Sequence, residues 1–119
     1  MAFTSIVITH QCRNLDGTFA SGAIRFRLTT RMTNTGVTYD PGVPLVATLN
    51  GTGQLSVTVP ANNDPTTISQ VPAAYVVAFE LNGATNQAIS GDEYTITVPY
   101  NAPGGTVDLG SLLPQQVGL

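Results

Sequence analysis

The chain has 119 residues, a length that suits one domain, and its hydrophobic content of 42% excludes a disordered tail. Only 9% of its residues are charged, against about 25% in an average soluble domain, and it contains no Lys. The net charge of −3 and the absence of a basic stretch exclude a typical nucleic-acid-binding domain.

The low charge bears on how the protein is used. Lys and Glu are depleted at protein interfaces, so a surface nearly free of them favours a subunit packed among neighbours. The alternative is a protein that stays dissolved through hydroxyl and amide side chains. No apolar run approaches the ~20 residues of a membrane span, and the first residues lack the basic region of a signal peptide. We therefore expect a chain that starts at or near Met1, stays in the cytoplasm until used, and has no membrane partner.

Alternating apolar residues predict seven strands in chain order, because a period of two places one face of a strand against a core. Asp16-Gly17 is a strong turn signal that precedes the second strand. Residues 32–42 are predicted to be a long connection, Asn50-Gly51-Thr52-Gly53 a hairpin turn, and residues 61–72 a polar loop. The predicted strands are 3–12, 23–31, 43–49, 54–59, 74–81, 93–100 and 106–109.

Seven short strands without a helical period predict an all-β fold, a single antiparallel β-sandwich of immunoglobulin-like or transthyretin-like type. The sandwich domain is expected over 1–110, followed by a C-terminal tail over 111–119. Pro44 predicts that the third strand lies at a sheet edge, and strand 74–81, apolar on both faces, is central or lies under a partner. The predicted core comprises Ile8, Ile24, Phe26, Leu28, Leu55, Val57, Val77, Phe79, Ile96 and Val98.

Candidate chemical groups are few. His10 and Cys12 share a strand face, but a structural zinc site needs four ligands and no second base is placed near His10. Asp92 and Glu93 point to opposite faces of a strand, so they do not form a carboxylate pair. Asn62-Asn63-Asp64 offers oxygen ligands without the spacing of a calcium loop, which favours a polar turn. We expect no enzyme activity, no metal and no cofactor.

Two segments are candidate protein interfaces. Arg25, Arg27 and Arg31 are expected on the outer face of the second strand, where a protein partner with carboxylates is favoured over nucleic acid. The uncharged tail either anchors on a neighbouring subunit or folds back over the open end of its own sandwich. Its apolar residues are Leu112, Leu113, Val117 and Leu119.

Six motifs spread over almost the whole chain carry a resemblance to a known group of proteins. They are Ile6-Val7-Ile8-Thr9-His10, Asn14-Leu15-Asp16-Gly17-Thr18, Ala20-Ser21-Gly22-Ala23-Ile24-Arg25-Phe26, Arg31-Met32-Thr33-Asn34, Leu49-Asn50-Gly51-Thr52-Gly53-Gln54-Leu55 and Gly105-Thr106-Val107-Asp108-Leu109-Gly110-Ser111-Leu112-Leu113-Pro114. In these motifs the chain resembles small β-sandwich virion proteins, of minor tail or decoration type, from tailed phages of actinobacteria.

The resemblance implies a structural, non-enzymatic subunit of a bacteriophage virion, made in the host bacterial cytoplasm and present in several copies. Its partners would be other virion proteins, either of the tail or the major capsid protein. A minor tail protein is the primary hypothesis, and a capsid decoration protein that stabilises the head is the alternative. A third hypothesis is a carbohydrate-binding module for the host surface, which needs exposed aromatic residues; without Trp, only the tyrosines remain.

Overall fold

The computed structural model describes residues 4–69, 71–81 and 93–113 of the chain. It is all-β, as predicted, and the only helical elements of this part are two short 3₁₀ turns, η1 (Pro103–Gly105) and η2 (Leu109–Ser111). The strands are β1 (Ser5–Gln11), β2 (Gly22–Leu28), β3 (Met32–Asn34), β4 (Val37–Tyr39), β5 (Leu45–Thr48), β6 (Gln54–Pro60), β7 (Tyr75–Leu81), β8 (Glu93–Ile96) and β9 (Thr106–Asp108).

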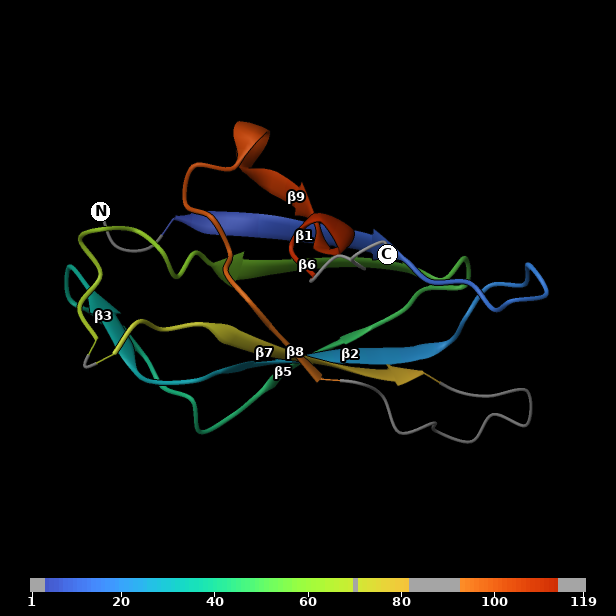
Figure 1. Cartoon of the computed structure of the whole chain (residues 1–119), viewed down its shortest axis with the longest axis horizontal. Coiled ribbons are helices and arrows are strands. Elements are labelled where there is room, and N and C mark those ends of the chain that lie inside the picture. The colour runs from blue at the N-terminus through green and yellow to red at the C-terminus, as the bar shows by residue number, and fades with distance from the viewer. Residues whose placement is uncertain (1–3, 70, 82–92, 114–119) are drawn as a thin grey trace, which may run out of the picture.

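The strands form three sheets. One has the order β6-β1-β9, one has the order β5-β2-β7-β8, and the third is the pair β3-β4. All pairings are antiparallel except that of β1 with β9, which is parallel. In Figure 1 the three-stranded sheet lies above the four-stranded sheet, and β3 lies at one end of the two layers. β5 lies at an edge and β7 is central, which confirms both predictions about these strands.

The buried side chains of the hydrophobic core come from the inner faces of the two larger sheets. Ile8 and Leu55 from one sheet and Phe26 and Val77 from the other belong to one buried cluster. Eight of the ten residues predicted for the core are buried; Val57 and Phe79 are half-buried and pack against the same cluster. Val57 lies on β6, an edge strand with a neighbour on one side only.

Several predicted strands were too long, and the structure gives the cause of two of the shortenings. The strand predicted over 43–49 begins at Leu45, because Pro44 has no N–H to donate to a ladder. The strand predicted over 93–100 ends at Ile96, and beyond it the Val98 N–H donates to the Asn62 side chain instead of a neighbouring strand. The strand predicted over 23–31 ends at Leu28, so Arg31 lies outside it.

The hairpin of β3 and β4 was not predicted from the sequence, and it lies within the predicted connection 32–42. Strands of three residues are too short to display a period of two. The turn between them places Thr35 at φ 43° and Gly36 at φ 82°, the two positive values that a type I′ hairpin requires. Thr33 of β3 also exchanges two backbone hydrogen bonds with Ile68, of 2.9 and 2.8 Å, which ties the hairpin to the loop after β6.

The turn at Asn50–Gly53 forms, but it does not make the predicted hairpin. The Gly53 N–H donates to the Asn50 carbonyl at 3.0 Å, so the turn itself is tight. The strands on either side of it pair elsewhere, β5 with β2 and β6 with β1, so the turn carries the chain from one sheet to the other. Gly53 has φ 69°, and a Cβ there would collide with the Cys12 carbonyl oxygen, so only glycine suits this crossing.

Candidate functional site

The outer face of the four-stranded sheet carries two of the predicted arginines. Ile24 and Phe26 of β2 are buried, so alternation turns Arg25 and Arg27 to the opposite, exposed face. Arg25 lies opposite Ala78 of β7, and Arg27 lies opposite Val76. This face therefore has small, half-buried apolar residues along its central strand and arginines beside them.

The charges of the three arginines are not equivalent. An Arg25 guanidinium nitrogen lies 3.1 Å from a carboxylate oxygen of Glu80, and Arg31 lies 3.4 Å from Asp40. Arg27 is exposed and has no ion pair within the described residues. Pairs this exposed contribute little to stability, about 0–1 kcal/mol. Contrary to the prediction from the sequence, Arg31 therefore does not share the outer face of β2 with Arg25 and Arg27. Of the two arginines on this face, Arg27 is the one whose charge is not neutralised by an ion pair with another described residue.

The beginning of the C-terminal tail lies against the chain's own core. Leu109 of η2 is fully buried, and Leu112 and Leu113 are half-buried against the same cluster. The N–H groups of Leu112 and Leu113 donate to the Leu109 carbonyl at 2.9 and 3.2 Å, which closes a compact turn. The other two predicted tail residues, Val117 and Leu119, lie outside the described residues.

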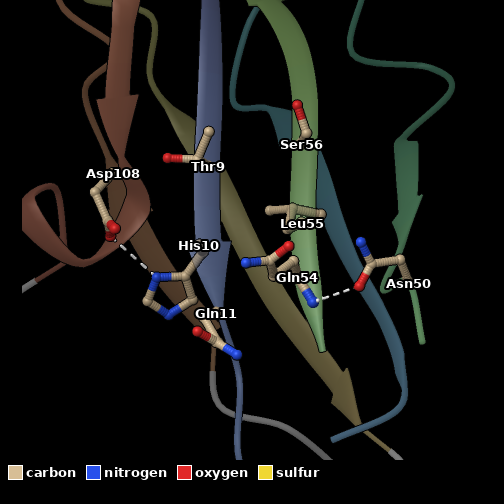
Figure 2. Close-up of a pocket in the computed structure, with 8 residues that line it drawn as sticks. All are labelled: Thr9, His10, Gln11, Asn50, Gln54, Leu55, Ser56 and Asp108. Atoms are coloured by element: carbon tan, nitrogen blue, oxygen red, sulfur yellow. Dashed lines mark hydrogen bonds and ion pairs between the residues drawn. The ribbon is translucent and has the colours of Figure 1, made fainter. Parts of the chain in front are cut away.

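His10 and Asp108 line an open depression of about 400 Å³ on the three-stranded sheet (Figure 2). The His10 Nδ1 atom lies 3.1 Å from Asp108 Oδ1, and the Gly110 N–H donates to the same oxygen at 2.7 Å. The Gly110 bond, followed by His10, holds the pKa of the Asp108 carboxyl below its ordinary value. The lining residues are Thr9, His10, Gln11, Asn50, Gln54, Leu55, Ser56 and Asp108.

The pair of His10 and Asp108 joins the side chains of β1 and β9. The His10 ring makes an edge contact with Phe79 at 6.2 Å between centroids. Within the described residues, its one hydrogen bond is to Asp108, and no hydroxyl or thiol is bonded to it. Sequence reasoning missed Asp108, because the partners are 98 positions apart and meet through the parallel pairing of β1 with β9.

The other candidate ligand residues bond to the backbone or are buried. Asn62 Oδ1 accepts from the Val98 N–H, and Asn63 Oδ1 accepts from the Tyr100 N–H. The Thr66 N–H and hydroxyl both donate to Asp64, which lowers the pKa of that carboxyl. Cys12 is buried, which raises the pKa of its thiol. The described residues contain no cluster of three or more His, Cys, Asp or Glu suited to a metal ion.

Glu93 lies exposed on β8, whereas Asp92, its neighbour in sequence, is outside the described residues. The exposed aromatic residues include Phe19, Tyr39 and Tyr100. The Arg13 guanidinium lies over the Phe19 ring, 4.9 Å from its centroid. The depression at His10 has no Phe, Tyr or Trp among its lining residues, so it offers no stacking platform for a sugar.

No protein-family model matches this chain, and no curated protein matches it. None of the helices in the described ranges is long and apolar enough to cross a bilayer.

Proposed function

We propose that this protein is a non-enzymatic structural subunit of a bacteriophage virion, present in several copies and bound to other virion proteins. A minor tail protein is the first assignment, and a capsid decoration protein that stabilises the head is the second. The resemblance in the turn and strand motifs supports the virion assignment. The surface, poor in charge and without Lys, supports a subunit packed among neighbours.

The fold that we propose is one β-sandwich with transthyretin-like strand order. If the β3–β4 hairpin is set aside as an insertion, seven strands remain in two sheets, and the first strand pairs with the fourth and the seventh. An immunoglobulin-like order would place the first strand beside the second, in a sheet with the fourth and fifth. The pairing of β1 with β6 and β9 therefore supports the transthyretin-like alternative.

The observation that carries the docking proposal is the outer face of the four-stranded sheet. Val76 and Ala78 give this face a small apolar centre, and Arg25 and Arg27 flank it on β2. Protein interfaces combine such a centre with a polar rim, and Arg is enriched in them. Because Glu80 already neutralises Arg25, Arg27 is the residue that would pair with a carboxylate of the neighbouring virion protein.

Electron microscopy with immunogold labelling of phage particles tests the assignment. Antibody against the purified protein should label the tail if it is a minor tail protein. Label over the head would support the decoration alternative, and particles without label would contradict both. A glycan array with the purified protein is the companion test, because binding to a host-surface glycan would instead favour the carbohydrate-binding hypothesis.

A further inference from the structure

The two larger sheets have four edge strands, and one of them differs from the rest. β5 and β8 have four residues each and β9 has three, and each carries a feature that discourages pairing with another chain. Pro44 precedes β5, Glu93 lies in β8 and Asp108 lies in β9. β6 has seven residues, contains no charged residue, and meets Pro only at its last position.

The hydrogen bonds around β1 and β6 show which backbone groups of β6 point away from the sheet. Ile8 lies opposite Val57 in this ladder, and the same register places Thr4 opposite Ala61 and Cys12 opposite Gly53 at its two ends. The Ala61 N–H donates to the Thr4 carbonyl at 2.8 Å, and the Cys12 N–H donates to the Gly53 carbonyl at 2.8 Å. Because bonded pairs alternate in an antiparallel ladder, Val57 and its alternate neighbours bond to β1. The residues between these bonded positions direct their backbone groups to the open edge of the sheet. They are Gln54, Ser56, Thr58 and Pro60.

The ends of this edge are satisfied inside the chain, and its centre is not. The Gln54 N–H donates to Asn50 Oδ1, and the Gln54 carbonyl accepts from the Asn50 N–H, both at 3.0 Å. Pro60 has no N–H, and its carbonyl accepts the Tyr75 hydroxyl at 2.6 Å. The backbone N–H and C=O groups of Ser56 and Thr58 have no hydrogen-bond partner in the described part of the chain.

We propose that two copies of this chain pair through β6, antiparallel, about a two-fold axis beside Val57. Ser56 of one copy then lies opposite Thr58 of the other, and each such pair exchanges two backbone hydrogen bonds. The two pairs related by the axis use all four outward N–H groups and all four outward carbonyls. The three-stranded sheets join into one continuous sheet across the two copies. An isologous contact of this kind closes at the dimer.

A second copy fits this edge because the strand is complementary to itself. On the exposed side the pairing sets hydroxyl against hydroxyl, a favourable cross-strand combination, and no like charges meet. On the inner side Val57 faces its own counterpart. Val57 is half-buried, whereas Leu55 and Val59 on either side of it are 3% and 2% exposed. The second copy would cover Val57, the one inward-facing side chain of β6 that the chain's own sheets leave partly exposed.

This inference does not rest on the proposed function. It concerns the three-stranded sheet, whereas Arg25 and Arg27 lie on the outer face of the four-stranded sheet, called here the arginine face. It is tested by sedimentation equilibrium over a range of protein concentrations. The unmodified protein should form a dimer that does not grow further. Ser56→Lys with Thr58→Lys should remain monomeric, because like charges then lie directly opposite each other across the axis. Circular dichroism of the monomer should match that of the unmodified protein.

Thr95→Lys with Thr97→Lys is the matched control, since both residues are exposed threonines two positions apart, Thr95 in the edge strand β8 and Thr97 directly after it. This control should still form the dimer. A mixture of the Ser56→Lys/Thr58→Lys variant with a Ser56→Glu/Thr58→Glu variant should restore dimers that contain one chain of each. A protein that is monomeric at every concentration, a dimer lost in the control but kept in the β6 variant, or growth beyond the dimer would overturn the proposal.

Discussion

The side-chain oxygen of Asn62 accepts a hydrogen bond of 2.6 Å from the backbone N–H of Val98, in the interior of the protein. The side-chain nitrogen of Asn62 donates to the Ala73 carbonyl at 2.5 Å. One amide thus joins the segment after β6 to the segments that precede β7 and follow β8. It takes the place that a neighbouring strand would have if the ladder of β8 continued.

We predict that Asn62→Ala lowers the free energy of unfolding by about 1–3 kcal/mol, because a buried N–H and a buried carbonyl lose their partner. Chemical denaturation monitored by circular dichroism measures this change. The matched control is Asn63→Ala, since Asn63 is exposed and bonds the backbone of Tyr100. Equal losses in the two variants would contradict the structural role assigned to Asn62.

The acid stability of the protein should depend in part on Asp108. Its folded-state pKa is lowered by the Gly110 N–H and then by His10, so its contribution to stability is present above the ordinary carboxyl pKa. That contribution is lost as the pH falls below about 4, where the carboxyl becomes protonated. Asp16 and Asp64 also have lowered pKa values, through their bonds to Thr18 and Thr66, and contribute in the same direction.

The comparison with Asp108→Asn isolates this residue, because the amide oxygen can still accept from Gly110 but carries no charge. We expect the stability difference between the two proteins to be constant near neutral pH and to shrink in acid. Urea denaturation at a series of pH values measures it. A difference that does not change with pH would show that the Asp108 charge does not act in the fold.

The C-terminal tail can be divided experimentally at residue 113. Leu112→Ala with Leu113→Ala should lower the free energy of unfolding of the monomer, by about 1–3 kcal/mol for two half-buried leucines. Removal of 114–119 takes away Val117 and Leu119, the tail residues beyond the described part. If these dock on a neighbouring subunit, the truncated monomer keeps its melting temperature and fails to enter particles. A truncated protein that melts much earlier would place them in the chain's own core.

If the protein is a virion subunit, as proposed, its incorporation into particles should depend on Arg27 more than on Arg25. Arg27→Glu should leave the melting temperature unchanged, because exposed substitutions rarely alter stability. It should reduce the amount of the protein in purified particles, since a carboxylate on the partner would then meet a like charge. Quantitative immunoblotting of particles measures this effect.

Two further variants separate docking from a general effect of charge. Arg25→Glu with Glu80→Arg exchanges the two charges of this ion pair and keeps the pair. It tests whether binding of the partner depends on which of the two positions carries the positive charge. Arg13→Glu is the control, because Arg13 lies over Phe19, outside the four-stranded sheet. If Arg27→Glu enters particles as well as the unmodified protein, the arginine face is not the docking surface.

The sequence alone predicted seven of the nine described strands, several of them too long, and which side of most of them is buried. The alternation of Ile24, Phe26 and Leu28 is a local property, so it can be recognised without knowledge of the neighbouring strands. The edge position of β5 followed from Pro44, which lacks an N–H. The outward side of β2, with Arg25 and Arg27, was predictable for the same local reasons.

Only the tertiary structure decided which strands pair. The turn at Asn50–Gly53 has the residues of a hairpin, yet β5 and β6 belong to different sheets. His10 meets Asp108 only because β9 lies parallel to β1, and the outward groups of Ser56 and Thr58 are open only because β6 lies at an edge. A strand with one apolar face can pair with any other that has the same pattern. The partner is therefore chosen by how all the strands together cover one core, which no local stretch of sequence encodes.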